Sequence, residues 1–75
     1  MPAEPPDVTP TIDMVGDRVA AQFPSGAMLT VSNDGCIELL FGSRKPTADE
    51  VVCFVSYLKV AGDLERAAAV ERWAA

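Results

Sequence analysis

Apolar and polar residues alternate along the first half of the chain, as they do in β-strands that bury one face. The alternation runs over residues 11–15 and 18–23, which are separated by Gly16 and Asp17. A pair of this kind, with glycine first, suits a two-residue hairpin turn. Counting across the turn puts the apolar residues of both segments on the same face. The pattern therefore predicts an antiparallel hairpin.

A second hairpin is expected over residues 27–32 and 36–41, connected by residues 33–35. If the loop has three residues, with Gly35 in the left-handed conformation, the apolar positions of the two strands face each other. A two-residue loop would instead turn Glu38 into the core, which is costly for an unpaired carboxylate. The three-residue loop therefore sets the expected register.

The second half of the chain has the spacing of helices. Thr47 and Glu50 match a capping box, in which each residue's side chain accepts a hydrogen bond from the other's backbone amide. Apolar residues then recur at helical spacing. Gly62 and Asp63 suit a C-terminal cap followed by a new N-terminal cap, so a long helix is expected to end there and a short one to cover residues 64–73. One continuous helix is the alternative.

Together these elements predict an α+β fold: a four-stranded antiparallel β-meander followed by one long and one short C-terminal α-helix, packed on one face of the sheet. The domain is expected over residues 11–75, after a flexible arm over residues 1–10 that is rich in proline and acids. The sheet positions expected to face the helices are Ile12, Met14, Val19, Ala21, Phe23, Leu29, Val31, Ile37, Leu39 and Phe41. The helix positions expected to face the sheet are Val51, Phe54, Val55, Leu58, Ala61, Leu64, Ala67, Val70 and Trp73 or Ala74.

Composition argues against most enzyme chemistries. The 75 residues suffice for one domain, and they include two cysteines and no histidine, which argues against a zinc site of the common kinds. Cys36 and Cys53 have no histidine to activate them, and the glycines form no phosphate-binding cluster. The acids near the sheet have no partner in view that would adapt them for acid–base work. We therefore expect a protein that is not an enzyme and has no metal or cofactor.

The net charge of −5 disfavours direct binding to nucleic acid, which depends on Lys and Arg neutralising phosphates. Arg44 and Lys45 form the only basic pair, and Arg66 and Arg72 are expected on a solvated helix surface. The chain lacks a signal-peptide pattern and an apolar run near the roughly 18 residues that span a bilayer. We expect a soluble, cytoplasmic protein that contacts neither nucleic acid nor membrane and binds a protein partner with a basic surface.

The sheet face turned away from the helices is the candidate binding surface. In the expected register, Met28 and Leu40 stand opposite each other there, as an apolar pair surrounded by polar and acidic residues, which is typical of a small interface. An ordinary solvated face is the alternative, because single exposed apolar residues are common. The acids lie on this face or in the adjoining turns. The candidate partner-binding residues are Asp13, Asp17, Met28, Asp34, Glu38 and Leu40.

In its short length, lack of an enzyme site, α+β pattern and acid excess, the whole chain resembles the small acidic inhibitors encoded by phages and mobile elements, of which anti-CRISPR proteins are the best-known group. No motif carries this resemblance, so no functional residue is transferred. It implies a stoichiometric inhibitor that acts in the host cytoplasm and occupies a basic nucleic-acid-binding surface of a CRISPR–Cas surveillance complex, blocking target DNA. The alternative is a homodimeric structural or regulatory accessory subunit that docks through the outer sheet face.

Overall fold

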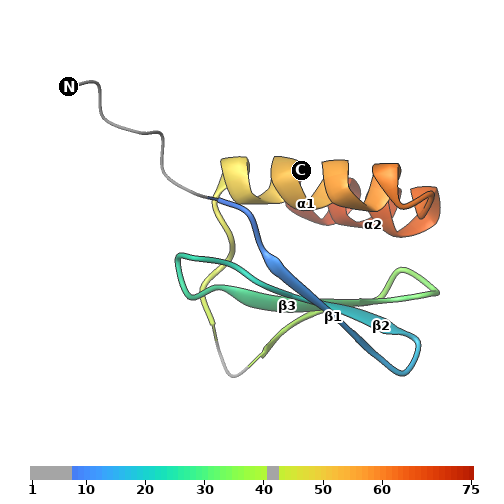
Figure 1. Ribbon diagram of the computed structural model, residues 1–75, viewed down its shortest axis with the longest axis horizontal. Helices are drawn as coiled ribbons and strands as arrows, with labels where there is room; N and C mark the ends of the chain where they lie inside the picture. Colours follow the sequence, from blue (N-terminus) through green and yellow to red (C-terminus); the bar gives the residue numbers. More distant parts are fainter. Residues whose placement is uncertain (1–7, 41–42) are drawn as a thin grey trace.

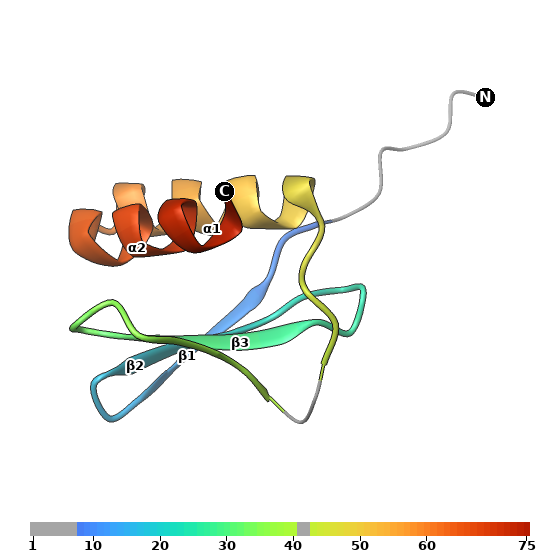
Figure 2. The same ribbon diagram turned by 180° about the vertical axis from the view of Figure 1, so that it is seen from behind.

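The computed structural model describes residues 8–40 and 43–75. Its strands are β1 (Thr11–Val15), β2 (Arg18–Gln22), β3 (Met28–Ser32) and β4 (Ile37–Leu39). They form one antiparallel sheet in the order β1-β2-β3-β4. The helices α1 (Ala48–Val60) and α2 (Leu64–Ala74) follow and lie side by side over one face of the sheet (Figure 1, Figure 2). The predicted α+β meander with two C-terminal helices is confirmed.

Both hairpins have the register expected from their turns. Met14 pairs with Val19 across the first turn, and Leu29 pairs with Leu39 across the second. Gly35 has a φ of 86°, the left-handed conformation that the three-residue loop requires. Turn chemistry therefore sets which side chains of neighbouring strands share a face.

The last strand is shorter than the predicted segment 36–41: β4 covers only Ile37–Leu39. The expectation for Phe41 lies outside the described residues. Beyond the strand, Ser43 serves the backbone of Met28: its hydroxyl accepts a hydrogen bond from the Met28 amide at 3.1 Å and donates one to the Met28 carbonyl at 2.9 Å. The Ser43 side chain thus makes the two hydrogen bonds with Met28 that a neighbouring strand would otherwise make at the start of β3. Most of the flexible arm expected over residues 1–10 is residues 1–7, which also lie outside the described residues.

The two helices are separate, as Gly62 and Asp63 predicted. Gly62 has a φ of 83°, and its amide donates to the carbonyl of Lys59 at 3.0 Å. The amide of Asp63 donates to the carbonyl of Leu58 at 2.8 Å, which completes a Schellman motif. The carboxylate of Asp63 then accepts a hydrogen bond from the amide of Arg66 and caps α2. The chain therefore reverses here, and α2 runs back alongside α1.

The core fills the space between the sheet and the helices. Its buried apolar residues are Val19, Ala21, Phe23, Ala27, Leu29, Val31, Phe54, Val55, Leu58, Ala67, Ala69 and Val70. Phe54 of α1 packs edge-to-face on Phe23, the residue directly after β2, with ring centroids 6.0 Å apart. Trp73 packs against the rim of this core, as expected, with Lys45 4.9 Å above its ring.

Three residues predicted to be buried are exposed. Met14 is 63% exposed, because β1 is an edge strand and α2 contacts β3 and β4, which lie toward the opposite edge of the sheet. Leu64 is also 63% exposed, because α2 buries Ala69 and turns its first residue to solvent. Ala61 is exposed at the C-terminal cap of α1. The spacing of apolar residues predicts each element correctly, but it does not show how much of the sheet the helices cover.

Candidate functional site

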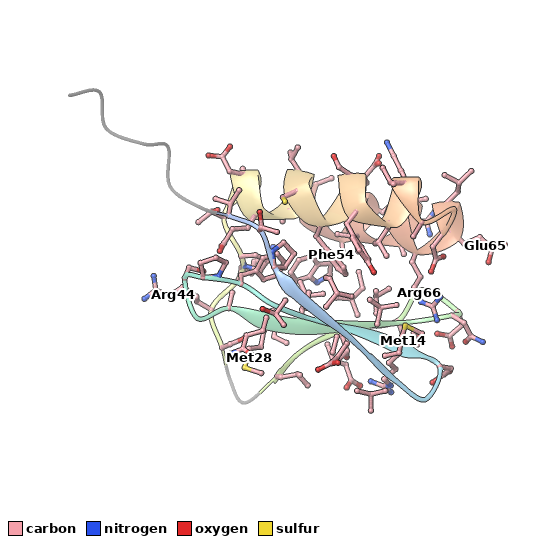
Figure 3. The ribbon with its side chains drawn as sticks, viewed as in Figure 1. Met14, Met28, Arg44, Phe54, Glu65 and Arg66 are labelled. Carbon is pink, nitrogen blue, oxygen red and sulfur yellow. The ribbon has the colours of Figure 1, made fainter. Side chains whose placement is uncertain are left out.

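Three of the six predicted partner-binding residues meet on the outer face of the sheet. Asp13, Met28 and Leu40 line a shallow hollow of about 80 Å³, together with Ala20 and Gln22. Met28 points away from the helices (Figure 3). Both Met28 and Leu40 are half-buried, so the apolar pair expected from the register is present as a small depression and not as a protruding patch.

The fourth residue, Glu38, is also on the outer face, but it has a partner that was not expected. Its Oε2 lies 2.8 Å from Nη1 of Arg18, and the pair reaches across β3 above Thr30, which is buried. The hydrogen bond and the negative charge of Glu38 raise the pKa of Arg18. The expectation that Glu38 stands without a partner is therefore wrong, because its charge is balanced within the sheet.

Asp34 helps to build the loop between β3 and β4. Its Oδ1 accepts a short hydrogen bond from the Ser32 hydroxyl and another from the Cys36 amide, the latter at 3.2 Å. These two hydrogen bonds, that from Ser32 first, lower the pKa of Asp34. The side chain is exposed, so it carries a stable negative charge at the surface of the loop.

Asp17 and Asp34 lie at the same end of the molecule. In a meander the first and third turns are at the same end of the sheet, and α2 also begins at this end (Figure 1). The start of α2 adds Glu65, and Arg44 lies at the opposite end of the molecule (Figure 3). Within the described residues, neither Asp17 nor Glu65 has an ion-pair partner. We call Asp17, Asp34 and Glu65 the acidic end.

A hollow of about 460 Å³ opens at the acidic end, between residues 33–35 and α2. Its walls carry Asp34 and Glu65, its apolar lining comes from Leu64 and Ala68, and Arg72 lies along the same helix. The combination of exposed Leu64 with carboxylates on two elements resembles the apolar centre and polar rim of an interface. The sequence pattern missed Glu65 and Leu64, because their position depends on where the reversed helix meets the strand ends.

Arg66 was expected on a solvated surface, and the structure corrects this. Its side chain is only 13% exposed. The guanidinium donates to the carboxylate of Asp63 at 2.6 Å, to the carbonyl of Val31 at 3.3 Å and to the carbonyl of Asp17. Arg66 therefore holds the first hairpin, β3 and the start of α2 together, and it gives the acidic end a fixed shape.

Glu50 is the one buried acid among the described residues, and its surroundings are structural. Its carboxylate is held by the Thr47 amide at 2.9 Å, the Ser25 hydroxyl at 2.8 Å and the Ser25 amide at 3.3 Å, so the predicted capping box is extended to the β2–β3 turn. Burial raises the pKa of Glu50, but the hydrogen bonds from Thr47 and Ser25 outweigh it, and the net pKa is lowered. The Glu50 carboxylate therefore connects the start of α1 to the β2–β3 turn.

Within residues 8–40 and 43–75, no group of three or more His, Cys, Asp or Glu side chains is placed to hold a metal ion. Cys36 is exposed and Cys53 is half-buried, and both are free thiols. None of the described helices has the length and apolar character needed to cross a bilayer.

Comparisons of the chain with protein-family models, with curated proteins and with solved structures found no match. Function is therefore inferred from the geometry and the charge of this chain.

Proposed function

We propose that this protein is a non-enzymatic inhibitor that binds a basic surface of a partner protein through its acidic end. The observation that carries the proposal is that Asp17, Asp34 and Glu65 lie at the same end of the molecule. Figure 3 shows Glu65 at this end and Arg44 at the other. Carboxylates collected in this way attract Lys and Arg side chains, steer the encounter and fix its orientation.

The shape of the acidic end suits such contacts. The carboxylates belong to a turn, a loop and a helix start. Arg66 connects the turn and the helix start to β3, and the Ser32 hydroxyl and the Cys36 amide hold Asp34 in the loop, so little ordering is needed on binding. Leu64 is exposed and lines the same hollow as Asp34 and Glu65, so it provides an apolar contact for the stem of a Lys or Arg side chain. Glu38 is left out of this surface, because Arg18 already neutralises it.

The class of partner follows from the resemblance to anti-CRISPR inhibitors. RNA-guided surveillance complexes hold nucleic acid in positively charged channels. A protein that places carboxylates where phosphates bind excludes target DNA by occupying the same cations. We therefore propose that the protein acts in the host cytoplasm on such a channel.

A gel-shift competition tests this function. Purified surveillance complexes of several types are mixed with labelled target DNA and increasing amounts of the protein. We expect the DNA shift to disappear at near-equal stoichiometry with one type. Inhibition should weaken as salt rises from about 0.05 to 0.3 M, because salt screens exposed charges. Unchanged DNA binding with every complex would contradict the inhibitor function, and inhibition that ignores salt would contradict the use of the acidic end.

The hollow on the outer sheet face supports a second candidate function, a homodimeric structural or accessory subunit. Met28 and Leu40 would pack on the same residues of a second copy, in a two-fold interface. Met28→Glu is then expected to give a folded monomer, whereas Val60→Glu, the same kind of change at a residue that is 90% exposed at the end of α1, leaves the dimer intact. Sedimentation velocity decides, since an unmodified protein that is monomeric at high concentration rules this candidate out.

A further inference from the structure

β1 forms an open edge of the sheet. Among the described residues its only strand neighbour is β2, and every residue of β1 except Ile12 is exposed. Met14 and Val15 are 63% and 60% exposed, whereas Val19, which pairs with Met14, is 4% exposed. The opposite edge, β4, has three residues and contacts α2. Among the described strands, β1 is therefore the longer and less covered edge.

The backbone of Ile12 and Met14 faces this edge. Opposite residues of an antiparallel pair alternate between those that exchange hydrogen bonds and those that do not. In a two-residue hairpin the residues that flank the turn, here Val15 and Arg18, are of the first kind. Asp13, two residues earlier, also directs its amide and carbonyl toward β2. Ile12 and Met14 consequently direct theirs outward, where a further strand would bind them.

The side chains of β1 define what kind of strand fits. Ile12 and Met14 are on the side of the helices and form an apolar strip that the helices leave partly uncovered. On the outer side, Asp13 lies between Thr11 and Val15 and has no ion-pair partner within the described residues. Side chains directly opposite each other on neighbouring strands interact, and opposite charges stabilise the pair. A fitting strand therefore alternates apolar residues with Lys or Arg.

We propose that the β1 edge binds an extended segment of a partner protein as a fifth strand, with apolar residues beside Ile12 and Met14 and a Lys or Arg opposite Asp13. Strand addition of this kind is a recurrent mode of peptide recognition. The inference rests on the proposed function in one respect, since both require a basic partner. Asp13 and Asp17 belong to the same hairpin, so a partner seated at the acidic end also reaches this edge.

A second copy of the chain is the less suitable occupant. Two β1 strands paired about Asp13 would set the two carboxylates opposite each other, which is destabilising. Pairing about Met14 would leave both aspartates without a cation, and each chain carries a net charge of −5. A charge in the middle of an edge strand is a common protection against self-pairing. Asp13 thus favours a basic strand over an identical one.

The test uses amide hydrogen exchange measured by NMR, with two blocked seven-residue peptides as probes. One alternates lysine with valine, and the other alternates glutamate with valine. In the free protein we expect the amides of Ile12 and Met14 to exchange much faster than those of Asp13 and Val15. The lysine peptide should slow exchange at Ile12 and Met14 by about tenfold or more, and the glutamate peptide should leave it unchanged.

Two variants separate backbone from side-chain effects. Met14→Pro removes an amide that faces the open edge, so the fold should persist while the lysine peptide no longer binds. Met14→Ala keeps the amide and should still bind. Unchanged exchange with the lysine peptide, or equal binding of both peptides, would overturn the proposal. The proposal would also be overturned if, without peptide, the Ile12 amide exchanged more slowly as the protein concentration rises, because that result shows that two copies pair through β1. Glu65→Gln should affect inhibition and not peptide binding, so the two proposals fail separately.

Discussion

Replacing Glu50 with alanine is expected to loosen the connection between the start of α1 and the β2–β3 turn. Glu50 is 2% exposed, and its carboxylate accepts three hydrogen bonds, one from Thr47 and two from Ser25. Removing it leaves the helix with half of its capping box and removes the only described side-chain hydrogen bonds between Ser25 and the helix. The change is thus a loss of local anchoring in a chain whose small core leaves little reserve.

The expected cost follows from these contacts. A lost cap costs about 1 kcal/mol, and a hydrogen bond to a charged acceptor in the folded protein contributes about 1.5–3 kcal/mol net of its exchange with water. Ser25 is exposed, so water replaces part of its loss, and we expect Glu50→Ala to lower the free energy of unfolding by about 2–3 kcal/mol. A chain of 75 residues has a total stability of about 4–11 kcal/mol, so a large share would be lost.

Guanidinium chloride unfolding, followed by Trp73 fluorescence and by circular dichroism, measures this loss. Asp49→Ala is the matched control, since Asp49 is exposed in the same helical turn and its removal should cost at most about 0.5 kcal/mol. Glu50→Gln, which keeps one acceptor oxygen, should fall between the two. A loss below about 1 kcal/mol for Glu50→Ala would refute the role assigned to this carboxylate.

The pH dependence gives an independent check on Glu50. Its pKa in the folded protein is lowered from the ordinary 4.5, so its charge stabilises the fold above that pH, and the contribution is lost as pH falls through the lowered pKa. The difference in stability between the unmodified protein and Glu50→Gln should therefore be constant near neutral pH and shrink in acid. A difference that grows in acid would show that the folded state prefers the protonated form.

Two further substitutions test the packing around the acidic end. Gly35→Ala combines a φ of 86° with a new Cβ 3.3 Å from that of Ala69, and it should cost about 1–2 kcal/mol for the left-handed backbone plus the cost of the contact. Gly26→Ala has a similar φ of 94° and open space, so equal losses in both variants would show that the contact contributes nothing. Arg66→Lys cannot keep all three of its acceptors and should cost about 1–2 kcal/mol in denaturant unfolding. Arg72→Lys, on the exposed side of the same helix, should change stability by less than about 0.5 kcal/mol, and a similar loss in both would contradict the role of Arg66.

Strand register and the helix break could be predicted because short segments determine them. The turn at Gly16, the loop ending at Gly35 and the reversal at Gly62 each require a positive φ, and glycine adopts it without strain. The connection between β2 and β3 has no comparable two-residue turn pattern. The register that brings Arg18 to Glu38 could therefore not be counted along the chain, and their ion pair was missed.

Whether a residue at the margin of the core is buried depends on where the helices lie over the sheet, and the spacing of apolar residues does not determine this. Met14 has the right period for the core but lies on the edge strand beyond the helices. Three consecutive alanines, residues 67–69, leave the buried side of α2 undefined in the sequence, so the apolar spacing places Leu64 inward, whereas the folded helix buries Ala69. The same placement puts Glu65 beside Asp34, and only the folded chain reveals this neighbour.

The most direct test of the central claim compares single acids of equal charge in the gel-shift competition. Asp17→Asn and Glu65→Gln each remove one charge from the acidic end, whereas Asp49→Asn removes one exposed charge from the start of α1. We expect the first two to raise the half-inhibitory concentration about five- to tenfold, equivalent to about 1–1.4 kcal/mol of binding free energy, and Asp49→Asn to change it less than about twofold. Equal effects of all three, or no effect of any, would contradict binding through the acidic end.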